Sequence, residues 1–143
     1  MVFLFISVRQ LSQPVAFTAV LAHDVTLGPH QAVEFDKIIT NVGNAYDSRD
    51  GQFTAPIDGL YMISATICSQ QSSSVHIEIV RNGVQLAAIY GDDYDLGSQT
   101  IMVQLNENDK VWVRHFFDSG FGYINNEADR HHTTFTGALI VAL

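Results

Sequence analysis

The amino-acid sequence predicts an all-β sandwich built from short antiparallel strands. Hydrophobic residues alternate with polar ones at a period of two along most of the chain, and no long run follows helical spacing. Turn residues interrupt the alternation, most clearly at Asn82-Gly83, where both residues tolerate a positive φ between two strand-like runs. About ten short strands separated by such turns are typical of a sandwich or jelly roll.

The alternation assigns an inward face to each strand. Strands are predicted, in chain order, over residues 61–67, 75–79, 101–105, 111–117 and 135–143. The strand over 75–79 carries His76 and Glu78 opposite its apolar face. In the last strand, the predicted inward set is Phe135, Gly137, Leu139, Val141 and Leu143.

The last strand is apolar on both faces, which a sheet with one solvated face does not require. Either loops of the same molecule cover its second face, or another copy of the chain does. Hydrophobic residues make up 47% of the chain and charged residues only 15%, against about a quarter in typical domains. This composition favours burial of the second face in an oligomer.

One spaced motif of aromatic and turn residues stands out between the first strands. Its members are Phe35, Asn41, Tyr46, Phe53, Gly59 and Tyr61. Their order and spacing resemble the motif of the complement C1q globular domain, a trimer-forming jelly roll of the C1q/tumour-necrosis-factor superfamily. That family usually has a Phe at the position of Ile63 and an aromatic residue at that of Ala65, and both replacements here keep the apolar alternation.

Three further segments are similar to this family: Val15–Ala19 to its opening strand, Leu105–Val113 to a turn and strand, and Thr133–Leu139 to its closing strand. The resemblance covers residues 15–143 and implies a ten-stranded jelly roll that assembles as a homotrimer. It also implies an extracellular protein. Residues 1–14 are then a separate N-terminal segment, either the remnant of a signal peptide or an ordered arm.

The N-terminal segment begins with the apolar run Met1–Val8 but has no basic start and no clear cleavage site of small residues. No apolar run approaches the ~20 residues of a transmembrane helix, so membrane insertion is not expected. Cys68 is the single cysteine and cannot form a disulfide within the chain. It is either a buried apolar residue, which we favour, or a thiol that pairs with a cysteine of another chain.

The charge balance excludes general nucleic-acid binding. The formal net charge is −8, and the seven Lys and Arg residues are scattered rather than clustered. Affinity for a phosphate backbone depends on clustered cations, which this chain lacks.

An acidic cluster at Asp92, Asp93 and Asp95 is the candidate metal site. Closely spaced carboxylates with backbone carbonyls of one loop suit Ca²⁺, which takes about 6–8 oxygen ligands. The resemblance also implies calcium here, because some C1q-domain proteins bind it through aspartates just before the strand matched by Thr100–Leu105. The alternative is a solvated acidic turn without a metal.

The longest polar loop, over residues 118–132, is the candidate ligand site. It combines aromatic rings with amide and charged groups, which is the chemistry that stacks on sugars and bonds their hydroxyls. The predicted ligand-binding residues are Tyr123, Asn125, Arg130 and His131. The alternative is an ordinary surface loop.

Two other patterns in the sequence bear on metal binding and catalysis. His131 and His132 are adjacent, and adjacent strand residues point to opposite faces, so they rarely share one ion. Ser72–Ser74 with His76 lacks a nucleophile elbow and an identifiable third member of a triad. The sequence therefore predicts no enzyme.

The sequence and its resemblance together predict a secreted, non-catalytic recognition protein that binds microbial or glycan surfaces in innate immunity. Its partners would be further copies of itself in a homotrimer and a glycan ligand, with calcium as its one cofactor. The alternative is a trimeric cytokine-like or structural module that engages a protein receptor.

Overall fold

The computed structural model describes residues 13–116, 122–125 and 130–143. Twelve strands and no helix occur within these residues, so no helix there could cross a membrane. Most of the N-terminal segment, residues 1–12, lies outside the described residues, as do residue 117 and residues 118–121 and 126–129 of the predicted ligand loop.

The strands are β1 (Ala16–Val20), β2 (Val25–Leu27), β3 (Lys37–Val42), β4 (Tyr46–Asp47), β5 (Gln52–Thr54), β6 (Gly59–Cys68), β7 (Ser74–Arg81), β8 (Val84–Asp92), β9 (Leu96–Leu105), β10 (Lys110–His115), β11 (Gly122–Ile124) and β12 (Thr134–Ala142).

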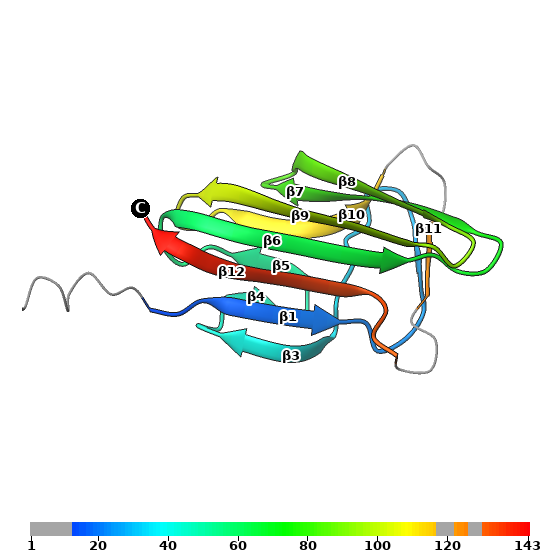
Figure 1. Ribbon diagram of the computed structural model, residues 1–143, viewed down its shortest axis with the longest axis horizontal. Coiled ribbons are helices and arrows are strands. Elements are labelled where there is room, and N and C mark those ends of the chain that lie inside the picture. The colour runs from blue at the N-terminus through cyan, green and yellow to red at the C-terminus, as the bar shows by residue number, and fades with distance from the viewer. Residues whose placement is uncertain (1–12, 117–121, 126–129) are drawn as a thin grey trace, which may run out of the picture.

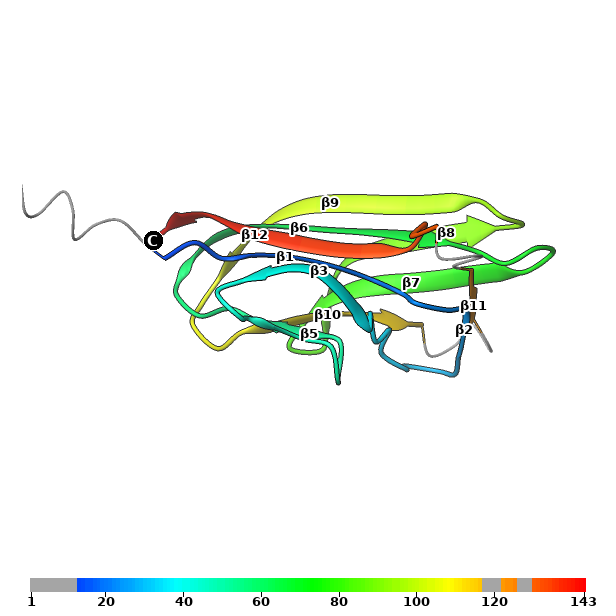
Figure 2. The same ribbon diagram turned by 90° about the horizontal axis from the view of Figure 1, so that it is seen from below.

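Two five-stranded antiparallel sheets pack face to face, as the edge-on view shows (Figures 1 and 2). The first sheet has the order β3-β1-β12-β6-β9 and the second the order β4-β5-β10-β7-β8. The chain crosses repeatedly between the two sheets, which is the connectivity of a jelly roll. The predicted fold is confirmed, with a small additional ribbon formed by β2 and β11.

Aromatic rings fill the space between the sheets. The ring of Phe17 on β1 stacks between Tyr46 and Phe53 of the other sheet, with centroid distances of 5.0 Å to each. Phe135 on β12 meets Phe17 edge-on at 4.9 Å and also contacts Phe35. All five rings are buried, so together they bridge both layers of the sandwich.

The spaced motif has a physical explanation at the crossing from β3 to β4. The amide side chain of Asn41 donates to the carbonyl of Tyr46 at 2.9 Å and accepts from its backbone N–H at 3.2 Å. The hydroxyl of Tyr46 donates to the carbonyl of Phe35 at 2.7 Å inside the core. Asn41 therefore takes the place of a strand partner and fixes the Tyr46 ring in the aromatic stack.

The inward set predicted for the last strand is correct only over its first half. Phe135 and Gly137 are buried and Leu139 is half-buried, but Val141 and Leu143 are 48% and 66% exposed. A register shift between Leu139 and Val141 in the pairing of β12 with β6 reverses the facing of the residues that follow. A bulge of this kind leaves no mark on the period-two pattern. The prediction that Cys68 is buried is confirmed.

The outward face of the first sheet carries two uncharged rows that cross all five strands. One row is apolar and consists of Val42, Ala16, Ala138, Met62 and Met102. The next row carries hydroxyls and consists of Thr40, Thr18, Thr136, Ser64 and Thr100.

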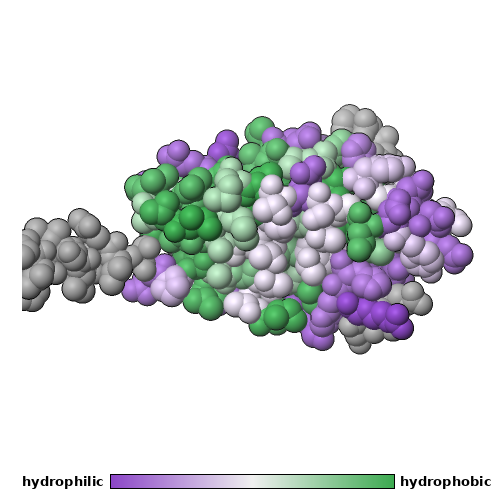
Figure 3. All heavy atoms as spheres, in the orientation of Figure 1, coloured by the Kyte–Doolittle hydropathy of each residue, from purple (hydrophilic) through white to green (hydrophobic). Residues whose placement is uncertain are grey.

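Hydrogen bonds pair the hydroxyls of this second row along the sheet. Thr18 and Thr136 lie 3.0 Å apart, and Ser64 and Thr100 lie 2.9 Å apart. Figure 3 shows the face, green near the C-terminus and pale over the hydroxyl row. We call these two rows the uncharged face.

Gly137 marks a place where the backbone of β12 approaches the core too closely for a side chain. A Cβ there would lie 2.5 Å from Cε1 of Phe17 and 3.0 Å from Cδ1 of Ile63. We expect Gly137→Ala to displace the Phe17 ring and to lower the free energy of unfolding by about 1–3 kcal/mol. Urea denaturation would measure the loss. Gly28→Ala, where the nearest atom is 3.7 Å away, is the control, and equal effects of both changes would refute this account.

Candidate functional site

The predicted site residues gather at one end of the sandwich. The β6–β7 and β8–β9 turns and the β2–β11 ribbon meet there, opposite the end where β1 begins and β12 ends (Figure 1). We call this the apical end. It has two hollows, which share Tyr94 and Asn125. One, of about 330 Å³, is lined also by Cys68, Leu96 and His132.

The second apical hollow, of about 270 Å³, is more polar. Besides Tyr94 and Asn125 it is lined by Asp24, Gln70 and Gln71. Gln70 belongs to the framework as well, because its side chain donates to the carbonyl of Ile124 at 3.0 Å and its backbone N–H donates to the carbonyl of Tyr123. The two hollows together present aromatic, amide, carboxylate, imidazole and thiol groups around Tyr94 and Asn125.

A buried hydrogen-bond network fixes the floor of these hollows. The backbone N–H of Asn125 donates to the carbonyl of Cys68 at 2.8 Å. The hydroxyl of Thr133 accepts from the N–H of Cys68 and donates to the carbonyl of Asn125, both at 3.1 Å. Burial raises the pKa of the Cys68 thiol, so the thiol is an uncharged part of this floor at neutral pH.

The acidic cluster lies in the turn between β8 and β9. Asp93 and Tyr94 have positive φ angles of 48° and 68°, which tighten the turn. The carboxylate of Asp93 accepts from the N–H of Ser72 at 2.9 Å, which joins this turn to the β6–β7 turn. The described residues include no group of three or more His, Cys, Asp or Glu side chains that could hold a metal ion. Calcium binding by Asp92, Asp93 and Asp95 stays a prediction.

The four predicted ligand residues lie in different surroundings. Tyr123 pairs with Thr26 in the β2–β11 ribbon and is half-buried, whereas Asn125 is buried between the two hollows. Arg130 is exposed. His131 approaches the amine of Lys37 at 3.3 Å, at the start of β3. The structure thus brings Asn125 close to the acidic turn, and it places His131 toward the edge of the first sheet.

Sequence reasoning missed Cys68, Gln70, Leu96 and His132 as lining residues of the apical end. Cys68 was assigned to the core and His132 was considered only as a partner of His131. The pairing of Cys68 with Leu96 across β6 and β9 was the available signal, but it requires the strand register. Such residues become neighbours only once the register is known.

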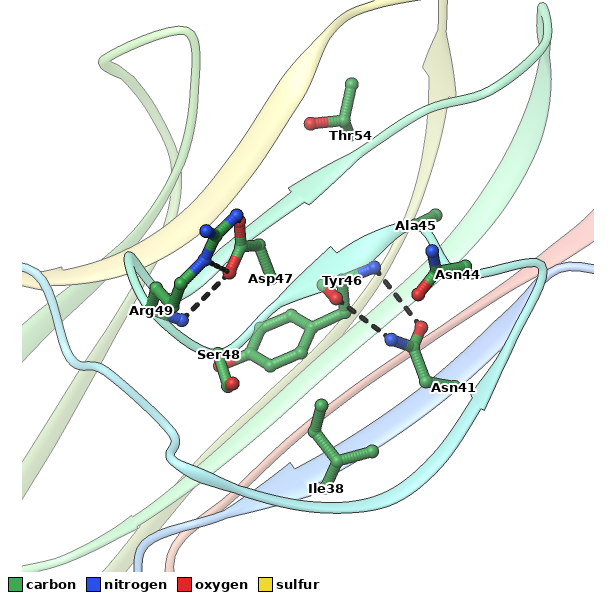
Figure 4. A pocket seen from close by; sticks show the side chains of 9 residues that line it. All are labelled: Ile38, Asn41, Asn44, Ala45, Tyr46, Asp47, Ser48, Arg49 and Thr54. Atoms are coloured by element: carbon green, nitrogen blue, oxygen red, sulfur yellow. Dashed lines mark hydrogen bonds and ion pairs between the residues drawn. The ribbon is translucent and has the colours of Figure 1, made fainter.

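A larger hollow, of about 600 Å³, lies on the flank between β3 and the β4–β5 hairpin (Figure 4). We call it the flank cavity. Its lining residues are Ile38, Asn41, Asn44, Ala45, Tyr46, Asp47, Ser48, Arg49 and Thr54. None of these was predicted as a ligand residue from the sequence, because the motif residues among them, Asn41 and Tyr46, were read for their role in the fold.

The cluster of Ser72–Ser74 and His76 is not arranged as a nucleophile with its base. The ring of His76 stacks on Phe116 with a centroid distance of 3.7 Å and meets Tyr90 edge-on. The hydroxyl of Ser73 donates to the carbonyl of Gln71 at 3.2 Å. These contacts give His76 a packing role on the outer face of the second sheet.

The fold and the apical loops define a C1q-type head, and sequence comparison agrees. The C1q domain family model matches residues 16–140. The chain belongs to the C1q-domain family.

Curated relatives include complement C1q tumor necrosis factor-related protein 6 of Mus musculus, which is 31% identical over 76% of this chain and 42% of its own length. Heavy metal-binding protein HIP of Mytilus edulis is 35% identical over 71% of this chain and 50% of its own length. Human complement C1q and tumor necrosis factor-related protein 9A is 36% identical over 76% of this chain and 33% of its own length. The chain thus spans between a third and a half of these relatives.

Solved structures share the fold. The globular domain of zebrafish complement 1qA protein superposes with a TM-score of 0.73 at 18% identity, over 90% of this chain and 99% of that domain. Eiger TNF from S. frugiperda superposes with a TM-score of 0.73 at 10% identity, over 92% of this chain and 96% of the Eiger chain.

Thr133 should control how tightly the apical floor is closed. Thr133→Val keeps the shape of the side chain but leaves the N–H of Cys68 and the carbonyl of Asn125 without this partner. We expect the free energy of unfolding to fall by about 1–3 kcal/mol and the Cys68 thiol to react faster with an alkylating reagent. Thermal unfolding and timed alkylation would measure both. Thr134→Val, on the outward face, should change neither, and unchanged thiol reactivity in Thr133→Val would contradict this role.

Proposed function

We propose that this chain is an extracellular, non-catalytic recognition protein that assembles as a homotrimer through its uncharged face and binds glycan or microbial surfaces at its apical end. The observation that carries the proposal is the combination of family membership with an exposed sheet face that lacks charge. Neither row of that face contains a charged residue, whereas the apical end carries charged groups such as Asp93 and Arg130.

The uncharged face supports self-assembly on physical grounds. Met102 is 54% exposed, and Ile140 and Val141 are exposed at the C-terminal end of β12. Contiguous exposed apolar surface of this kind marks interaction sites in soluble proteins. Four of the five hydroxyls of the second row are already paired within the sheet, so burying them leaves few groups without a partner.

A trimer would place three apical ends on one side of the assembly. Each apical hollow is small, and a single sugar contact in such a site is expected to be weak. Linked sites raise the overall avidity by about 10²–10⁴ over that of one site when the ligand surface lets them bind together. A repetitive glycan surface meets this requirement.

The ligand contacts would come from Tyr123, Arg130 and His131 at the surface, with Asn125 and the apical hollows behind them. Aromatic faces stack on the C–H faces of sugars, and amide or guanidinium groups bond their hydroxyls. Calcium would use Asp92, Asp93 and Asp95, since only Oδ1 of Asp93 accepts from Ser72 and its second carboxylate oxygen can ligate the ion.

Self-assembly can be tested by placing a charge on the uncharged face. Met102→Asp would bury a carboxylate between subunits, where it has no partner, so we expect the assembly to dissociate. Light scattering after gel filtration should give a mass near three times 15.8 kDa for the unaltered chain. The variant should have a mass near 15.8 kDa, that of one chain. Val84→Asp changes an apolar residue on the second sheet that is 66% exposed, against 54% for Met102, and this variant should remain a trimer. A monomeric unaltered chain would refute the proposal.

Glycan recognition can be tested on a glycan array, with and without calcium. We expect selective binding, a loss of about tenfold or more in Tyr123→Ala and Arg130→Ala, and a calcium dependence that Asp95→Ala removes. Equal binding with and without calcium would refute the calcium site at the aspartates, but it would leave the proposed glycan binding unaffected. A trimer that binds no glycan would instead favour the protein-receptor alternative.

A further inference from the structure

We propose that the flank cavity is a second ligand site, which binds a neutral saccharide through two adjacent hydroxyls. The ligand class is shared with the proposed function above, but the residues and the position are different. The flank cavity lies between β3 and the β4–β5 hairpin, away from the apical end, and Tyr123, Asn125, Arg130 and His131 take no part in it.

The centre of the proposed site is an ion pair at the rim of the cavity. Nε and Nη2 of Arg49 donate to Oδ1 and Oδ2 of Asp47 at 3.1 Å and 2.8 Å. Nη1 of Arg49 takes part in neither bond, and the Arg49 side chain is 89% exposed. Donor and acceptor groups therefore lie side by side (Figure 4). Such a pair matches two neighbouring hydroxyls of a sugar, each of which both donates and accepts.

The pair keeps its charges over the physiological range. The hydrogen bonds from Arg49 lower the pKa of Asp47 to about 2, so the carboxylate remains an acceptor at any pH well above that value. The two charges offset each other at the rim. The net charge of −8 on the whole chain also disfavours polyanionic ligands. Both facts favour a neutral saccharide over an anionic one.

The local backbone holds this pair in place before any ligand arrives. The N–H of Arg49 donates to Oδ1 of Asp47 at 2.9 Å, and the N–H of Gly51 donates to the carbonyl of Asp47 at 2.9 Å, which closes the turn between β4 and β5. On the other side, Asn41 fixes the backbone of Tyr46. Prior order of this kind reduces the entropy cost of binding a small, flexible ligand.

The rest of the cavity has the mixed chemistry of a sugar site. Ile38, which is 42% exposed, and the half-buried Ala45 provide apolar surface for the C–H groups of a pyranose ring. Asn44, Ser48 and Thr54 surround it with amide and hydroxyl groups. A hollow of about 600 Å³ has room for one or two sugar residues.

The experiment compares binding of the full chain to immobilised yeast mannan and dextran, each before and after periodate cleavage of adjacent diols and reduction of the products. We expect the unaltered chain to bind at least one intact polysaccharide. Arg49→Ala should weaken that binding about tenfold or more, and Arg49→Lys should not restore it, because an ammonium group cannot form the bidentate pair. Arg81→Ala, which removes an arginine outside the cavity, is the matched control and should bind as the unaltered chain does.

The outcomes separate this site from the apical one. Loss of binding in Arg49→Ala, with normal binding in Tyr123→Ala, supports the flank site and shows that the apical site does not bind this polysaccharide. The reverse pattern overturns this inference and leaves the proposed function standing. Failure to bind either polysaccharide, or undiminished binding after periodate treatment, also overturns it. Binding should stay constant between about pH 5 and pH 8, because Asp47 does not titrate there.

Discussion

The sandwich depends on the stack of aromatic rings between its two sheets. Phe17 stands between Tyr46 and Phe53, and Phe135 closes the stack from the side. The rings come from both layers, so they fix how the sheets face each other. Aromatic pairs contribute about 0.5–1.5 kcal/mol each beyond the area they bury, and their geometry favours one arrangement over alternatives of similar hydrophobicity. Tyr46 also connects this stack to the flank cavity, because its ring is buried in the stack while the residue lines the cavity.

Much of the fold could be predicted because the residues that build it carry local signals. The period-two alternation marks β6, β7 and β10, and Asn82 and Gly83 do have positive φ angles in the hairpin between β7 and β8. The spaced motif was informative because each member has a separate physical task. Asn41 replaces a strand partner, whereas Tyr46 joins the core stack and binds the carbonyl of Phe35.

The parts that could not be predicted depend on register and turn geometry. The shift after Leu139 exposes Val141 and Leu143, although the pattern of residues continues unchanged. Cys68 and Leu96 lie far apart in the sequence and line one hollow only because β6 pairs with β9. Arg49 and Asp47 are close in sequence, but nothing in their spacing reveals a cavity beneath them. The apical loops were predicted as a site because loops on a rigid sandwich often carry function.

The chain enters the sandwich and leaves it at the same end. Ala16 at the start of β1 pairs with Ala138 in the antiparallel strand β12, so β1 begins and β12 ends at the side opposite the apical loops (Figure 1). A tether attached to the chain just before β1 or just after β12, such as a fusion partner or a sensor chip, therefore holds the sandwich at the end opposite the apical loops. The apical loops then point outward and the flank faces sideways. A surface-bound layer of this protein would offer its two candidate sites in different directions, one toward distant ligands and one toward its neighbours.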